Sequence, residues 1–307
     1  MICIVGALAV DLLIHRDRFR KGTSNPATIR VTPGGVGYRI YSHLDGPKML
    51  FTALGSDVFG KWLIENLVQP QWVNPIFLDQ YPTACYCALT QSGELLYGAA
   101  DMAVIEQGLN WPRLRARLPE LGAKDYLVLE ANLAPELVRS LIRHAGARTR
   151  VVFESVSVEK LLRHAENLKN LYLLSGNEAE VRALGEWFAA GRASRFDSWV
   201  QDYLGRMRIE QLLVTRGRRG VSLYRREAGD GAEPGGGGPG GSGGRGAGRR
   251  GPLTLQPDRL IEAGDTTGAG DRLMSAYLEA LDREAEPVDA LRRAVESVER
   301  SLEEGTL

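Results

Sequence analysis

The run Asp265-Thr266-Thr267-Gly268-Ala269-Gly270-Asp271 combines small residues with carboxylates and stands directly before a segment of helical periodicity. Small residues let the backbone approach a ligand closely, and the free N–H groups and positive dipole end of a helix start favour an anion. Asp271 would stand beside those amides, where it could accept a proton from a hydroxyl while the amides neutralise the phosphoryl group under attack. This arrangement predicts a kinase. The alternative is that Asp271 only stabilises the dipole of the helix that it begins.

The bulk composition limits the classes of protein to consider. The chain has 307 residues, 44% of them hydrophobic, enough for the core of one large domain or two smaller ones. Its 38 basic and 38 acidic side chains cancel, so net charge gives no reason to expect nucleic acid or a membrane surface as a partner. The sequence has neither an apolar run of membrane-spanning length nor the pattern of a signal peptide before Ile2-Cys3-Ile4-Val5. We therefore expect a soluble, cytoplasmic protein.

Short apolar runs recur along the chain and are separated by segments of helical periodicity. Such runs are typical of strands buried on both faces, and they occupy residues 2–8, 49–54, 126–129, 151–153, 171–174 and 211–214. The alternation predicts an α/β fold with a mainly parallel sheet flanked by helices.

Three segments depart from this alternation. Residues 12–31 are polar and extended, and residues 83–100 have the pattern of a hairpin that turns at Gln91-Ser92-Gly93-Glu94. Together they predict a small β lid, which would exclude water from a bound substrate. Residues 228–251 are dominated by glycine, and we expect a disordered insert there.

Several motifs resemble the ribokinase-like (PfkB) family of carbohydrate and nucleoside kinases. They are Pro33-Gly34-Gly35-Val36-Gly37, the Asp265–Asp271 run, Asn177-Glu178-Ala179-Glu180, and Thr215-Arg216-Gly217 with Gly220. The resemblance implies a three-layer α/β sandwich in a single kinase domain that spans residues 1–307. Within the family, the chain is most similar to the pseudouridine kinases, through Gly22-Thr23-Ser24-Asn25-Pro26, Asp101-Met102-Ala103, Ala131-Asn132-Leu133 and Val156-Ser157-Val158.

The resemblance implies a role for each matching residue in an ATP-dependent phosphorylation of the 5′-hydroxyl of pseudouridine. Asp271 would be the base, with amides from Gly268, Ala269 and Gly270 at the transferring phosphate. The nucleoside would be bound by Asp11, Thr23, Asn25, Gly35 and Asn132. ATP would be bound by Asn177, Thr215, Gly217, Gly220, Gly268 and Gly270. Glu180 and Glu154 would serve Mg²⁺, and K⁺ is implied as a further cation. From the residues alone, Asn177 and Glu180 could instead cap a helix, Thr215 and Gly217 could form a hairpin turn, and Asn25 and Asn132 could be turn residues.

The chain also departs from the family pattern. Arg39 stands where the family has an Asn that contacts substrate, and Gly46-Pro47 predict a helix near residues 40–48 that is about one turn short. The C-terminal segment ends without the further loop of its relatives. Two alternatives therefore stay open. The first is a kinase that acts on another nucleoside or on a sugar, and the second is a catalytically impaired relative that binds a nucleoside. An apolar outer face on the lid would favour a homodimer through it.

Overall fold

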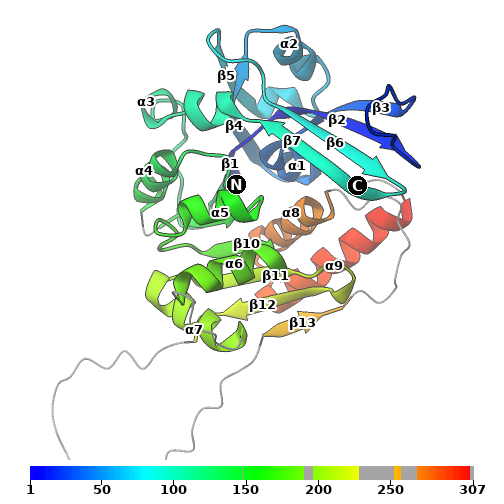
Figure 1. The fold of residues 1–307 in the computed structure, drawn as a ribbon. Coiled ribbons are helices and arrows are strands. Elements are labelled where there is room, and N and C mark those ends of the chain that lie inside the picture. The colour runs from blue at the N-terminus through cyan, green and yellow to red at the C-terminus, as the bar shows by residue number, and fades with distance from the viewer. Residues whose placement is uncertain (147, 190–195, 228–251, 257–267, 305–307) are drawn as a thin grey trace, which may run out of the picture.

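A nine-stranded sheet runs through the protein (Figure 1), in a computed structural model that describes residues 1–146, 148–189, 196–227, 252–256 and 268–304. Seven neighbouring strands are parallel. Two more strands extend one edge, and each pairs antiparallel with the strand before it. In spatial order the strands are β13 (Leu253–Leu255), β12 (Val221–Arg225), β11 (Gln211–Thr215), β10 (Leu173–Asn177), β9 (Arg150–Glu154), β8 (Tyr126–Glu130), β1 (Ile2–Val5), β4 (Lys48–Gly55) and β5 (Val73–Leu78).

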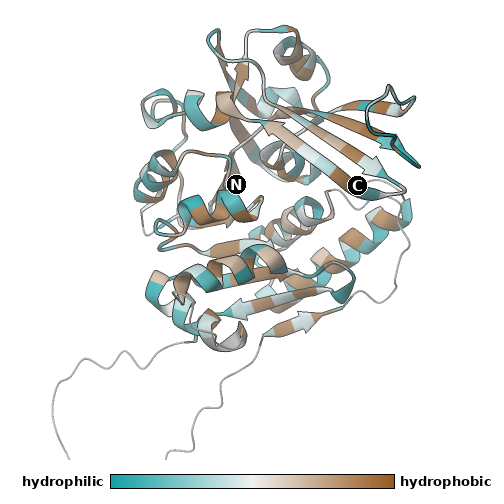
Figure 2. Cartoon of the chain, in the orientation of Figure 1, coloured by the Kyte–Doolittle hydropathy of each residue, from teal (hydrophilic) through white to brown (hydrophobic). Residues whose placement is uncertain are grey.

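Helices cover both faces of this sheet, which explains why its strands are apolar on both sides. Cys3 and Val5 of β1 pack in one core cluster, and Ile2 and Ile4 pack in the other. The first core includes residues of α3 (Trp111–Leu114), α4 (Pro135–Ala145), α5 (Val158–His164), α6 (Glu178–Phe188), α7 (Phe196–Met207) and a π-helical turn at Val104–Gly108. The second includes residues of α1 (Val36–His43), α2 (Val58–Glu65), α8 (Ala269–Asp282) and α9 (Pro287–Glu304). Figure 2 shows polar and apolar residues alternating along α6 and α9, as helices on a sheet require. The predicted three-layer α/β sandwich is confirmed.

The predicted lid is a second sheet of four strands in the order β3-β2-β6-β7 (Figure 1). Its strands are β2 (Ala9–Arg16), β3 (Thr28–Gly34), β6 (Cys85–Gln91) and β7 (Glu94–Asp101). β2 follows β1 after only three residues, so the lid begins at the carboxyl edge of the large sheet. Every residue of β7 is exposed.

The glycine motif before α1 is explained by close packing. Gly35 has φ 88°, and a Cβ there would lie 2.7 Å from the carbonyl oxygen of Ala7. A Cβ on Gly34 would lie 2.1 Å from the carboxylate of Asp11, so this glycine leaves the space that the carboxylate occupies. α1 ends at His43, which confirms the short helix that Gly46-Pro47 predict.

Some sequence predictions fall on residues that the structure does not describe. The glycine-rich insert 228–251 lies outside the described residues, and so do Asp265, Thr266 and Thr267 of the anion-binding run. Within the described ranges, no helix combines the length and apolarity that crossing a bilayer requires.

Candidate functional site

Polar residues end the parallel strands along one edge of the large sheet. Glu130 and Glu154 are the last residues of β8 and β9 and are register partners. Asn177 and Thr215 end β10 and β11 and are also register partners. Because the carboxyl ends of parallel strands meet at one edge, the fold brings the predicted ATP and metal residues together there. Glu130 was not among the predicted site residues.

The start of α8 lies against this edge and carries Asp271. Gly268 caps the helix in a left-handed conformation with φ 94°. The N–H of Arg272 closes the first helical hydrogen bond, to the carbonyl of Gly268 at 2.9 Å, so the helix itself does not use the N–H groups of Ala269, Gly270 and Asp271. The predicted anion cradle and the carboxylate beside it therefore share one helical turn.

Electrostatics links Asp271 to the carboxylates of the strand ends. Burial raises the pKa of Asp271 to about 7; the nearby Arg39 guanidinium lowers this pKa, whereas Asp11 and Glu130 raise it. Burial likewise raises the pKa of Glu154 to about 8, with smaller contributions from Asp271 and other acids. A carboxyl group with a pKa near 7 suits proton acceptance at neutral pH.

Arg39 joins the sugar side of the site to the anion cradle. Its Nη2 donates to Oδ2 of the buried Asp11 at 2.6 Å, and a Cβ on Gly268 would lie 2.9 Å from its Nη1. Burial raises the pKa of Asp11 although Arg39 opposes the shift. Among the described residues, Oδ1 of Asp11 has no hydrogen-bond partner, and an acceptor hydroxyl group could supply one. The departure that the sequence marks at position 39 thus lies within the site.

A second polar group surrounds Asn132, at the end of β8. Glu130 accepts hydrogen bonds from the backbone N–H groups of Ala7 at 2.9 Å and Asn132 at 3.0 Å, and also from the side-chain amide of Asn132. Lys160, on α5, donates its Nζ proton to Oδ1 of Asn132. Burial raises the pKa of Glu130 and lowers that of Lys160. Glu130 and Lys160 were missed from sequence, where the only signal for Glu130 is a charged residue that closes a buried strand.

The residues on the nucleotide side also have structural roles. Asn177 and Glu180 form a capping box at the start of α6, and Oε2 of Glu180 accepts from the N–H of Asn177 at 2.7 Å and from Oγ of Ser155 at 2.5 Å. Thr215 ends a strand whose hairpin partner is β12, and Gly217 and Gly220 have φ of 55° and 85° in the turn. Asn177 and Glu180 therefore do cap a helix, and Thr215 and Gly217 do belong to a hairpin. Their roles in binding ATP and metal stay predictions.

Thr23 and Asn25 lie in the loop between β2 and β3 of the lid. The side chain of Asn25 accepts from Nη1 of Arg16 at 3.0 Å and from the N–H of Arg20 at 2.8 Å, and donates to the carbonyls of Arg20 and Thr23 at 2.9 Å. All four contacts are within the lid, as in the turn-residue alternative. The structure therefore does not bring Asn25 into contact with Asp11 or Asp271.

Two comparisons by sequence found no match, neither a protein-family model nor a curated protein. Comparison with solved structures found many similar folds. A carbohydrate kinase from Agrobacterium tumefaciens has a TM-score of 0.72 at 23% identity and covers 98% of this chain and 90% of its own. Arabidopsis thaliana ribokinase complexed with ribose and ATP has a TM-score of 0.70 at 17% identity, with coverages of 98% and 92%. Phosphofructokinase-2 from Escherichia coli in complex with potassium has a TM-score of 0.72 at 19% identity, with coverages of 99% and 94%. The chain therefore has the ribokinase-like fold.

Proposed function

We propose that this protein is an ATP-dependent kinase that transfers a phosphoryl group to an alcohol of a sugar or nucleoside. The observation that carries the proposal is the position of Asp271, in the first turn of α8, beside Arg39 and against the carboxyl edge of the parallel sheet. The three solved structures compared above are named as a carbohydrate kinase, a ribokinase and a phosphofructokinase, which supports the same reaction class.

In the proposed mechanism, Asp271 accepts the proton of the attacking hydroxyl group. The first-turn N–H groups of α8 and the Arg39 guanidinium stabilise the negative charge on the transferring phosphoryl group, and the lid excludes water. The remaining contribution is alignment, because phosphoryl transfer demands little covalent chemistry from the protein.

Mg²⁺ fits the acidic strand ends as a hydrated ion rather than one held directly by protein groups. Within the described ranges, no three acidic, His or Cys side chains converge as a direct metal site. Oε2 of Glu154 is buried without a hydrogen-bond partner, and Glu180 lies on the neighbouring helix, so both could bind waters of a hydrated ion. When bound with ATP, the ion would neutralise charge on the phosphates.

We infer pseudouridine as the acceptor, with its 5′-hydroxyl group as the attacking nucleophile. Support comes from the short sequence matches at residues 22–26, 101–103, 131–133 and 156–158, and from the buried polar groups of Asp11 and Asn132. Another nucleoside or a sugar is the second candidate, and ribose is the ligand named for the Arabidopsis structure. The Arg39–Asp11 ion pair supports a third candidate, a nucleoside-binding relative without turnover, since it occupies one oxygen of Asp11.

A substrate panel separates these candidates. The protein is incubated with MgATP, with and without K⁺, and with pseudouridine, uridine, adenosine, ribose or fructose 6-phosphate. New phosphate esters are then detected by ³¹P NMR. Pseudouridine 5′-phosphate as the main product supports the proposal, and preference for ribose or adenosine transfers it to the second candidate. Calorimetric binding of pseudouridine without any product identifies the third.

We also propose a homodimer through the lid. The lid exposes the apolar side chains of Ile29, Val31, Leu95, Leu96 and Tyr97, with exposed fractions between 42% and 68%. A second copy that pairs with this surface would cover those side chains.

A further inference from the structure

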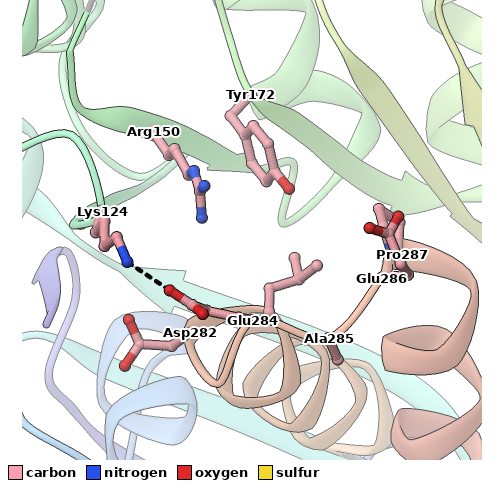
Figure 3. A pocket seen from close by; sticks show the side chains of 9 residues that line it. Lys124, Arg150, Tyr172, Asp282, Glu284, Ala285, Glu286 and Pro287 are labelled. Atoms are coloured by element: carbon pink, nitrogen blue, oxygen red, sulfur yellow. Dashed lines mark hydrogen bonds and ion pairs between the residues drawn. The ribbon is translucent and has the colours of Figure 1, made fainter.

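A cavity of about 290 Å³ lies at the edge of the large sheet opposite the candidate active site. Lys124 and Arg150 line it from the starts of β8 and β9, and Tyr172 lines it from the residue before β10 (Figure 3). The opposite wall is the connection between α8 and α9, residues 282–287. The cavity is therefore built from the amino ends of the strands on one side and the α8–α9 connection on the other.

Most of the charges around the cavity are already neutralised. Lys124 pairs with Glu284, and the α-amino group of Met1 donates to Asp282 at 3.4 Å. Glu284 is held by the backbone as well, because it has φ 64° at the end of α8, where its N–H bonds to the carbonyl of Leu281 at 3.0 Å.

Arg150 is the cation whose charge is not neutralised in this way. Its guanidinium lies over the rings of Tyr126 and Tyr172, 5.2 and 5.3 Å from their centroids, and Nη1 donates to the hydroxyl of Tyr126 at 2.5 Å. Within the part of the chain that the structure describes, no carboxylate lies within 4 Å of the Arg150 guanidinium, and Glu210 and Glu284 act on it only from a greater distance. The two rings and the Tyr126 hydroxyl hold the guanidinium, and Figure 3 shows its end directed into the cavity. A guanidinium so held can accept a planar carboxylate with two parallel hydrogen bonds.

The other residues that line the cavity indicate what kind of group could accompany a carboxylate bound to Arg150. Leu281, Ala285, Pro287 and the ring of Tyr172 supply apolar surface. Glu286 places negative charge at the opposite wall, which disfavours a doubly charged phosphate more than a singly charged carboxylate.

We propose that this cavity binds a small monocarboxylate with an apolar or aromatic body, its carboxylate on Arg150 and its body against Tyr172 and Leu281. The site is separate from the kinase site and does not depend on the proposed reaction. It contacts the last turn of α8, the helix whose first turn carries Asp271.

The test measures the binding of 3-phenylpropionate to the full chain by calorimetry and by ¹H–¹⁵N NMR. The comparison ligands are 3-phenylpropanol, which lacks the charge, and phenyl phosphate, which carries two charges. We expect the alcohol and the phosphate to bind at least about tenfold more weakly, because a charge-assisted hydrogen bond is lost or repulsion is added. Shifted amide signals should map to residues 124, 150, 172 and 281–287.

The matched variants are Arg150→Gln and Arg292→Gln, the latter on an exposed arginine of α9 that pairs with Asp289 outside the cavity. Arg150→Gln should weaken 3-phenylpropionate binding at least about tenfold, and Arg292→Gln should leave it unchanged. Equal binding of the acid and the alcohol to the unmodified protein overturns the proposal, and this comparison holds even if Arg150→Gln fails to fold. Absence of binding, or shifted signals confined to other surfaces, overturns it as well.

Discussion

The pKa of Asp271 predicts how the proposed phosphotransferase activity depends on pH. Burial raises this pKa to about 7, and a base must be ionised to accept a proton. Activity should therefore fall as the pH is lowered through 7 and should level off above it. If the same carboxyl had its usual pKa near 4, the rate would not change with pH across this range.

The size of the effect follows from the fraction of Asp271 that is ionised. A single group with a pKa of about 7 is about nine-tenths ionised at pH 8 and about one-tenth ionised at pH 6. The value of kcat/KM should thus drop about tenfold between these pH values, with a limiting slope of about one in the logarithmic plot. Release of ADP, followed in a coupled assay in buffers of constant ionic strength, gives the profile.

Arg39→Gln is the variant that checks the cause of the inflection. The Arg39 guanidinium lowers the pKa of Asp271, so its removal should move the inflection to higher pH. A profile that is flat between pH 5.5 and 8, in protein that stays folded, would refute the assignment of Asp271 as the base. So would an inflection that Arg39→Gln leaves in place or moves to lower pH.

Three further predictions concern stability, metal use and assembly. Gly35→Ala should lower the free energy of unfolding by about 2 kcal/mol or more, because φ at Gly35 is 88° and the new Cβ would meet backbone atoms. Gly46→Ala, where a Cβ would meet nothing, should change it by less than about 0.5 kcal/mol. Urea denaturation measures both variants, and equal effects would contradict the packing argument. Glu180→Gln should raise the MgCl₂ concentration needed for half-maximal activity several-fold, since a carboxylate facing the hydrated ion is lost; an unchanged titration assigns Glu180 to the helix cap alone. Leu95→Ser with Tyr97→Ser should convert a dimer into a monomer in size-exclusion chromatography with light scattering, and a monomeric parent protein would contradict the lid dimer.

Local patterns were enough to predict a mainly parallel sheet and the lid, but not the strands β5, β12 and β13. The buried runs became the parallel strands because each is apolar on both faces, and two of the three segments that depart from the alternation became the lid. Gly46-Pro47 also gave the end of α1 correctly, since the signal lies within a few residues of the helix.

Contacts between distant segments could not be predicted in this way. Glu130 receives a hydrogen bond from Ala7, which is 123 residues away, and Arg39 reaches Asp11 across 28 residues. Such contacts depend on strand order and on the close approach that Gly34 permits, neither of which has a local signature. The side chain of Asn25 is used by the loop in which it stands, a local contact that the sequence offered as an alternative, and its role toward substrate stays a prediction.

The most direct test of the proposed mechanism is the rate of phosphoryl transfer by Asp271→Asn beside the unmodified protein. ³¹P NMR would follow product formation from saturating MgATP and the best acceptor of the panel, with thermal melting as the control for folding. The substitution keeps the shape of the side chain and removes proton acceptance, so we predict a rate about 10² to 10⁴ times lower at an unchanged melting temperature. Equal rates for the two proteins would contradict the account, because the carboxylate at the start of α8 would then take no part in the reaction.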